Sequence, residues 1–237
     1  MSQLDYTLGT LTPANPDASL PATVTGCAVI AGPGVTTLGT FAQALDFSAG
    51  GELKVALPLP ALNRTKFCTR IVFKIDTAVT ARQDLTNSNA LPFDLYLAPG
   101  TGASAFHLVT SVKSKAHGWA KASTEFFFDL HLTTWYTADL VYDTDTLAVF
   151  VDGVIYSVHA LPNGTIADGT ADQLYAGVAA NETDFAFKGA LAALQLHDDI
   201  PIELETQLDE RRAHPQWYLT YKQASAKSKR TPCHHAR

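Results

Sequence analysis

The sequence predicts an all-β domain of packed antiparallel strands, followed by one short helix near the C-terminus. Between residues 44 and 197, short runs of β-branched and aromatic residues are separated by turn residues every 8–14 positions, a spacing typical of sandwiches and barrels. Helical periodicity is nearly absent there and is confined to about residues 200–213. The chain has 237 residues, 46% of them hydrophobic, which is enough for one large β domain with its own core.

Strands are expected where apolar runs end at Gly, Pro, Asn or Asp. These runs cover residues 43–47, 52–57, 67–76, 92–98, 105–112, 125–131, 136–142, 147–152, 154–159, 173–179 and 187–197. Residues 1–37 are rich in Gly, Pro, Thr and Ala. We expect them to form a lead-in with one or two edge strands.

One hairpin is predicted in detail, because Asp152-Gly153 supplies the two positive-φ positions of a type I′ turn. A two-residue loop places three cross-strand pairs on one core-facing side: Val151 with Val154, Val149 with Tyr156, and Leu147 with Val158. The opposite face is apolar too, and we expect it to be covered as well: Ala148, Phe150 and Ile155.

The helix is predicted over residues 200–213. Asp199 can cap it, Pro201 fits its first turn, and two arginines in its last turn complement the helix dipole. Its apolar face consists of residues that recur every four positions: Ile200, Leu204 and Leu208.

Charge is unevenly distributed along the chain. Residues 222–237 hold five basic residues and no acidic one, so the rest of the chain has twelve basic against 23 acidic residues, a charge of −11. An acidic body argues against general nucleic-acid binding, which requires a basic face. We expect residues 222–237 to be a flexible tail, because the contiguous Cys233, His234 and His235 cannot by themselves enclose a zinc ion.

Neither an export signal nor a membrane segment is recognised. The N-terminal residues lack a basic region followed by an apolar one, and no apolar run reaches about 18 residues. We therefore expect a soluble chain without membrane contact, cytoplasmic by default. Three widely spaced cysteines are expected to be free thiols.

Four segments, in this order, resemble laminin-G-like domains of the concanavalin A-like lectin/glucanase superfamily. They are ALDFSAGGELKVALP (44–58), FCTRIVFKID (67–76), WYTADLVYDTDTLAVFVDG (135–153) and FKGALAALQLHDDIP (187–201), and the similarity covers about two thirds of the chain. The resemblance implies a two-sheet antiparallel jelly-roll sandwich, which we place at residues 38–221. It implies no activity, because this fold carries lectins, adhesion modules, hydrolases and lyases.

The sequence does not favour an enzyme. Glucanase relatives carry a Glu-x-Asp-x-x-Glu strand with two carboxylates in reach of one bond, and this chain has no such strand; its nearest pair, Glu203 and Glu205, falls on the predicted helix. Lyase relatives use Gln-x-His with a Tyr and an Arg-x-Glu strand. Gln195, His197 and Tyr175 match the first part, and the second is missing.

Carbohydrate binding needs an aromatic platform and planar polar groups. Trp119 lies in a polar, glycine-containing stretch, residues 113–123, that is unsuited to a buried strand. Asn87 and Asn89 belong to a polar segment before Pro92, and Asn163 lies in another loop. Loops on a rigid sandwich commonly carry ligands, so these four residues are the candidate ligand-binding groups.

Calcium is common in the resembled superfamily and requires several converging oxygen ligands. The loop at residues 163–172 is the best candidate, with Asp168 and Asp172 as metal ligands. The favoured function is a non-enzymatic glycan-binding module with no cofactor other than, at this loop, calcium. The alternative is a protein-interaction or structural domain that assembles with copies of itself, as a homo-oligomer, and a polysaccharide hydrolase or lyase ranks third.

Deleting residues 223–237 should leave the melting temperature unchanged within a degree or two, because the segment has almost no apolar area to bury. Differential scanning calorimetry of the full and shortened chains measures the effect. A drop of several degrees would mean that the tail docks on the acidic body.

Overall fold

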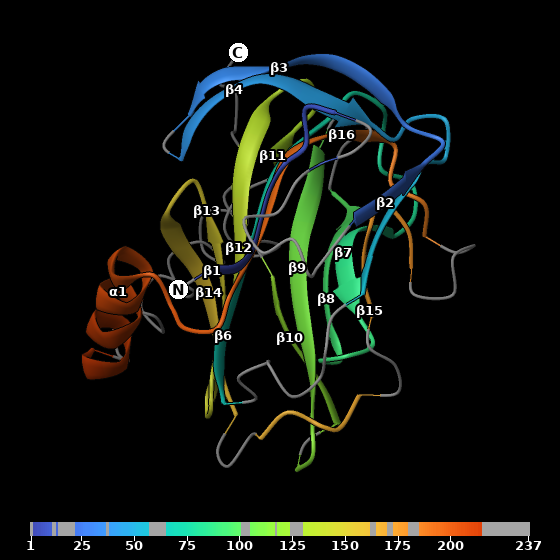
Figure 1. Ribbon diagram of the computed structural model, residues 1–237. Coiled ribbons are helices and arrows are strands. Elements are labelled where there is room, and N and C mark those ends of the chain that lie inside the picture. The colour runs from blue at the N-terminus through green and yellow to red at the C-terminus, as the bar shows by residue number, and fades with distance from the viewer. Residues whose placement is uncertain are drawn as a thin grey trace, which may run out of the picture.

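The computed structural model describes residues 2–10, 13, 22–36, 38–56, 65–100, 105–116, 118–123, 130–161, 165–169, 173–179 and 185–214. Within these residues the chain forms a jelly-roll sandwich of two antiparallel sheets with a helix on one outer side (Figure 1). The prediction of an all-β fold with one short C-terminal helix is confirmed. No helix among the described residues is long and apolar enough to cross a membrane.

The first sheet, sheet A, contains the long central strands of the resembled segments. Its order is β14 (Val154–Ala160), β13 (Thr146–Val151), β12 (Trp135–Asp143), β6 (Lys66–Ile75), β16 (Gly189–His197), β4 (Gly39–Asp46) and β3 (Ala28–Thr36), with β1 (Ser2–Thr7) paired to the C-terminal half of β16. The paired strands β3 and β4 arch over one end of the sandwich (Figure 1).

The second sheet, sheet B, faces sheet A across the core. Its order is β10 (Gly118–Ser123), β9 (Ala105–Ser114), β8 (Phe93–Pro99), β7 (Gln83–Ser88), β15 (Gln173–Ala176), β5 (Glu52–Ala56) and β2 (Ala22–Thr25), with the short β11 (Leu130–His131) paired to β9. Strand β10 is therefore at an edge of this sheet.

The core lies between the sheets and is built from the inward-facing side chains of both. Aromatic rings link the two sheets: Phe67 of β6 lies 5.4 Å from Phe93 of β8, and Phe73 lies 6.2 Å from Phe106 of β9, measured between ring centroids. The N-terminal segment contributes as well, since Tyr6 is fully buried in this cluster. Burying large apolar side chains between two sheets is the main stabilising contribution in such folds.

The outer face of sheet A is also apolar and is covered by α1 (Ile202–Ala213). Phe150 and Ile155 of the hairpin strands pack there against residues on one face of the helix and just before it: Ile200, Leu204 and Leu208. Two predictions are thus confirmed: the apolar face of the helix and the covered outer face of the hairpin. The two faces pack against each other.

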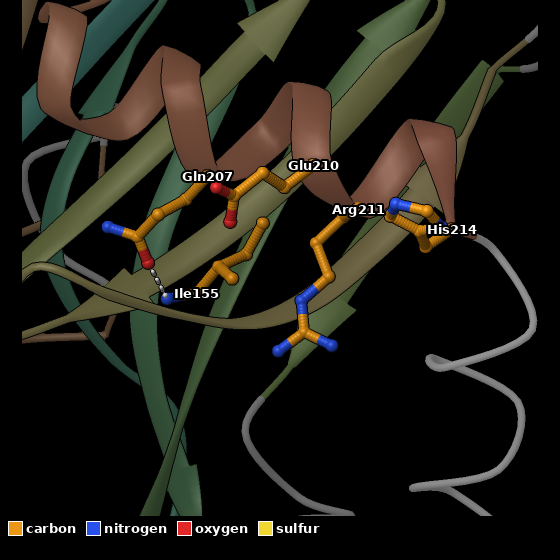
Figure 2. Close-up of a pocket in the computed structure, with 5 residues that line it drawn as sticks. All are labelled: Ile155, Gln207, Glu210, Arg211 and His214. Atoms are coloured by element: carbon orange, nitrogen blue, oxygen red, sulfur yellow. Dashed lines mark hydrogen bonds between the residues drawn. The ribbon is translucent and has the colours of Figure 1, made fainter.

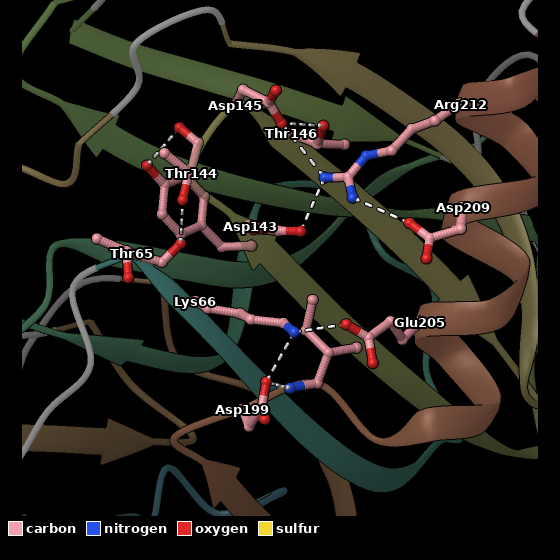
Figure 3. A network of polar contacts seen from close by, with 12 residues as sticks. Thr65, Lys66, Asp143, Thr144, Asp145, Thr146, Asp199, Glu205, Asp209 and Arg212 are labelled. Carbon is pink, nitrogen blue, oxygen red and sulfur yellow. Dashed lines mark hydrogen bonds and ion pairs between the residues drawn. The ribbon is translucent and has the colours of Figure 1, made fainter.

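Ion pairs surround this helix–sheet contact (Figure 3). Lys66 of β6 reaches Glu205 of the helix at 2.5 Å and Asp199 at 3.0 Å. Arg212 in the last helical turn reaches Asp143 at 2.9 Å and Asp145 at 3.3 Å. The side chains in these pairs are partly exposed to solvent, so each pair contributes little to stability, whereas together they align the helix with the strands beneath it.

A buried ion pair lies under the same helix. Arg70 of β6 contacts Asp139 of the neighbouring β12, and the Asp139 side chain has no exposed surface. Arg70 also reaches Glu203 of the helix at 3.2 Å. Asp139 Oδ2 accepts no hydrogen bond, so the carboxylate depends on Arg70 for most of its stabilisation.

The helix begins differently from the prediction. Its N-cap is Pro201, which has no side-chain cap, and the Pro201 carbonyl accepts hydrogen bonds from the backbone N–H groups of Leu204 and Glu205. The expected cap, Asp199, instead accepts the Ile200 N–H at 2.8 Å and pairs with Lys66. An ammonium group within reach therefore replaces the helix N-terminus as the partner of this carboxylate.

The hairpin turn is confirmed, and its register is corrected. Asp152 and Gly153 have φ values of 50° and 76°, as a type I′ turn requires, and Val151 pairs with Val154. A bulge beyond Phe150 then shifts the register, so that Val149 faces Ser157 and Leu147 faces His159. One consequence is that Val158 turns to the helix side, and Val154 at the turn is 48% exposed.

Several strands lack an apolar signal and were not expected. Strand β10 presents only small residues, Ala120 and Ala122, to the core, and β7 has a bulge that interrupts its alternation. The lead-in contributes three strands where one or two were expected. Within the expected strand 125–131, residues 125–129 lie outside the described residues, and β11 covers its end.

Asp139 should make stability depend on pH in a specific direction. Burial raises the pKa of its carboxyl from 3.8 to about 6, against the opposing effect of Arg70. Between about pH 4 and pH 6 the folded state therefore binds more protons than the unfolded state, so the free energy of unfolding falls as pH rises through this window.

The free energy of unfolding of Asp139→Asn should fall less between about pH 4 and pH 6 than that of the wild type, by on the order of 2 kcal/mol. This difference is independent of the effect of the substitution on absolute stability. Urea unfolding at several pH values between about 4 and 7 measures the slope. Asp76→Asn, which changes a carboxylate with a 48% exposed side chain, is the control and should keep the wild-type slope. Equal slopes for all three proteins would contradict the assignment.

Candidate functional site

The outer face of sheet B carries polar and aromatic side chains that alternate with its core residues. At its centre, the guanidinium of Arg82 binds two carboxylates. It reaches Asp84 at 2.6 Å and 3.0 Å and Asp94 of β8 at 3.2 Å. The same group lies between two rings, 4.1 Å from the centroid of Tyr96 and 4.6 Å from that of Phe185. Arg82 thus joins β7, β8 and the segment that precedes β16.

The polar groups in this centre bind one another. Asp84 is 1% exposed, and burial raises the pKa of its carboxyl to about 6 even though Arg82 lowers it. Asn87 donates its amide to the Val178 carbonyl at 2.6 Å and lies 3.4 Å from Asp84 Oδ2. The centre of the face is therefore a self-contained polar cluster, with little polar surface offered outward.

One end of sheet B is formed by three segments, which we call the loop end: residues 89–92, residues 113–121 apart from 117, and residues 165–169. Backbone hydrogen bonds of 2.8–2.9 Å join them, from Lys113 N–H to the Pro92 carbonyl and from Lys115 N–H to the Thr165 carbonyl. Ser114 and Ile166 add an isolated β-bridge. Segments distant in sequence therefore meet around the β9–β10 hairpin.

Gly169 permits the close approach of two of these segments. A Cβ atom at this position would lie 2.2 Å from the carbonyl oxygens of both Asn89 and Ala90. No side chain fits at that distance, so glycine is needed for residues 165–169 to pack on the β7–β8 turn. This contact also brings Asp168 to the loop end, where Lys115 Nζ lies 3.2 Å from its Oδ2.

Trp119 is the exposed aromatic residue of the loop end, with 49% of its surface accessible. It lies on β10 and pairs with Lys113 of β9, while Lys121 two positions on pairs with Ser111. Ala120 and Ala122 point to the core, so Trp119 and Lys121 face outward. Sequence reasoning identified the indole as exposed but assigned it to a turn; the edge strand holds it more rigidly.

The structure brings some of the predicted site residues together. Trp119, Asn89 and Asp168 all belong to the loop end. Asn87 does not, because it lies within β7 rather than in a loop and is 2% exposed. Asn163 and Asp172 lie outside the described residues. Lys113 and Lys121, exposed beside Trp119, were not singled out, since their placement depends on the β9–β10 register.

The described part of the loop end does not by itself make a calcium site. Calcium needs six to eight oxygen ligands, and the described residues contain no group of three or more His, Cys, Asp or Glu side chains suited to a metal. The Asp168 carboxylate already pairs with the Lys115 ammonium. Calcium coordination that includes Asp172 stays a prediction.

Asp84 is poorly placed to act as an acid in glycoside hydrolysis. A general acid must reach the glycosidic oxygen, and Asp84, despite its raised pKa, is 1% exposed beneath Arg82. The lyase-like trio is divided between the sheets, since Gln195 and His197 lie on β16 of sheet A and Tyr175 lies on β15 of sheet B. These residues cannot act on one substrate bond.

A groove of about 420 Å³ lies on the opposite side of the molecule, between α1 and β14 (Figure 2). Gln207 bridges it by accepting the Ile155 N–H at 3.3 Å and donating to the Gly153 carbonyl at 2.7 Å. The charged side chains of Glu210 and Arg211 line the rest. These contacts fasten the helix to the hairpin, and the described residues that line the groove include no Trp, Tyr or Phe.

The sequence matches no protein-family model and no curated protein, whereas the fold is similar to solved structures. Domain 4 of AbnA, a GH43 extracellular arabinanase from Geobacillus stearothermophilus, in complex with arabinotriose, aligns with a TM-score of 0.60 and 14% identity over 87% of this chain and 97% of that one. The botulinum neurotoxin serotype G binding domain aligns with a TM-score of 0.63 and 8% identity over 87% of this chain. The chain spans 50% of that neurotoxin chain. Identities this low show a shared β-sandwich fold alone.

Arg82→Met should destabilise the domain by about 3 kcal/mol, because it leaves the buried Asp84 without its guanidinium partner. Urea unfolding at pH 7 measures the loss. The double variant Arg82→Met/Asp84→Asn should recover most of it, since a neutral amide costs less to bury. A loss below about 1 kcal/mol in the single variant would show that Arg82 does not hold this face together.

Proposed function

We propose that this chain is a non-enzymatic binding module of the lectin-like, concanavalin A-like type, and that it binds a glycan at the loop end of sheet B. The observation that carries the proposal is the exposed indole of Trp119 on a rigid edge strand, 49% accessible and bordered by polar side chains. Aromatic rings present a flat apolar surface with a polar handle, and the apolar face of a sugar ring is complementary to such a surface.

The surroundings of Trp119 support a ligand with many hydroxyl groups. Asn89 and Asp168 lie on the two loops that pack together through Gly169, and both carry planar groups that can form paired hydrogen bonds. The arabinanase domain of similar fold is described in complex with arabinotriose. That ligand belongs to that domain, and here it supports only the class of ligand proposed.

A protein ligand is the second candidate. The neurotoxin domains of similar fold include a receptor binding domain, that of the C/D mosaic serotype, with a TM-score of 0.62 and 10% identity over 87% of this chain. An exposed edge strand such as β10 can also pair with another chain. Self-association through β10 would place Trp119 in an interface between copies, and light scattering over a range of concentrations detects it.

Trp119→Ala should weaken glycan binding while leaving the fold intact. The side chain is half exposed, so its removal costs the domain about 2 kcal/mol of stability, whereas loss of a stacking platform weakens sugar binding by about ten- to a hundredfold. A glycan array finds the ligand, and titration calorimetry with that glycan compares the variants.

Val154→Ala is the matched control, because Val154 is 48% exposed on the far hairpin. It should bind the glycan as the wild type does. The proposal fails if no glycan on the array binds the wild-type chain. It also fails if Trp119→Ala keeps the wild-type affinity, or if Trp119→Ala unfolds.

A further inference from the structure

The loop end is basic although the protein as a whole is acidic. Lys113, Lys115 and Lys121 are all exposed there, while the net charge of the chain is −6. Asp168 is paired with Lys115 and offsets one of the three charges. A local excess of positive charge on a negative body creates a field that attracts anions to one place.

Strand register places two of these lysines beside the Trp119 indole. Lys113 is the cross-strand partner of Trp119, and directly opposed residues on one face of an antiparallel pair lie about 5 Å apart. Lys121 follows Trp119 on the same face of β10, about 7 Å further along the strand. The Trp119 position therefore has one lysine opposite it on β9 and another next to it on the same face of β10.

The position of Lys121 is defined further by an aromatic ring. Its Nζ atom lies 5.8 Å from the centroid of the Tyr96 ring, whose other contact is the Arg82 guanidinium at 4.1 Å. Arg82 carries one positive charge against the carboxylates of Asp84 and Asp94, so the Lys121 ammonium group lies beside a cluster with one negative charge in excess. Tyr96 is level with Ser123 in the strand register, so the Lys121 ammonium group leans toward the centre of the face, away from the Trp119 indole.

From this geometry we infer that the glycan bound at the loop end is acidic: its sugars carry carboxylate or sulfate groups that pair with Lys113 and Lys121 while a ring stacks on Trp119. The inference rests on the proposed function and specifies its ligand class. Ammonium groups on flexible stems bind either anion. Uronates and sulfated sugars therefore both supply the anionic group that the lysines can bind.

Titration calorimetry with four probes tests the inference: an oligogalacturonate, a sulfated galactan oligosaccharide, a neutral galactan oligosaccharide of the same length, and a single-stranded oligonucleotide of matched charge. At about 0.02 M salt, an acidic sugar should bind at least about tenfold more tightly than the neutral one, and at about 0.3 M salt most of this advantage should disappear. The preferred acidic sugar identifies the anion.

Lys113→Gln/Lys121→Gln should weaken the acidic sugar about five- to tenfold at low salt and leave the neutral one unchanged. Lys54→Gln is the control and should change neither affinity. Lys54 is on β5, several strands from β10, and its ammonium group lies over the ring of Tyr175. Trp119→Ala should weaken every sugar that binds.

The outcomes separate the two proposals. If the neutral sugar binds as tightly as the acidic ones, or if the double lysine variant behaves as the wild type, the ligand is not acidic and glycan binding itself still stands. If only the oligonucleotide binds, the ring that stacks on Trp119 is a nucleic-acid base and not a sugar, and both proposals fail. If no probe binds and the glycan array is also negative, the proposed function fails and this inference fails with it.

Discussion

The pairing of Asp84 and Asp94 with Arg82 is the constraint on which the character of the outer face of sheet B depends. Two carboxylates on neighbouring strands of one sheet repel each other and resist burial. One guanidinium, held between the Tyr96 and Phe185 rings, binds both. The polar groups at the centre of the face are thereby bound to one another, with one negative charge in excess. The groups left to meet a ligand are those at the edge, on β10 and the loops beside it.

The outer faces of the two sheets differ in their side chains and in whether a helix covers them. Sheet A presents apolar side chains outward, and α1 covers them, with Arg70 pairing Asp139 beneath the helix. Sheet B has polar side chains outward and needs no cover of that kind. Because the helix and its ion pairs occupy one face, a ligand of the described region is better accommodated on the other. The groove beside α1 is bridged by Gln207 and serves that packing.

Sequence reasoning was reliable where burial leaves a pattern and failed where it does not. Continuous apolar runs predicted β6 and β12, and the Asp152-Gly153 turn fixed the first hairpin pair, because these are local consequences of burial and of φ. The bulge beyond Phe150 has no local signature.

Strand β10 was missed because its inward residues are alanines, which are common in loops too. The exposure of Trp119 could be predicted from its polar neighbours. Its lysine partners could not, because their proximity depends on a register set by the whole sheet, and Asn87 was misplaced because its polarity suggested a loop when it serves a buried network.

The central claim is that the ligand binds at the edge of sheet B and not beside the helix. Mapping the binding site in solution tests this claim most directly. Titrating ¹⁵N-labelled protein with the oligosaccharide that binds best, and following backbone and indole N–H resonances, reports the site residue by residue. The account predicts shifts of the Trp119 indole and of residues 113–121 and 165–169, with residues 202–213 unchanged. Shifts concentrated in residues 202–213 and 153–158, with the Trp119 indole unmoved, would contradict it.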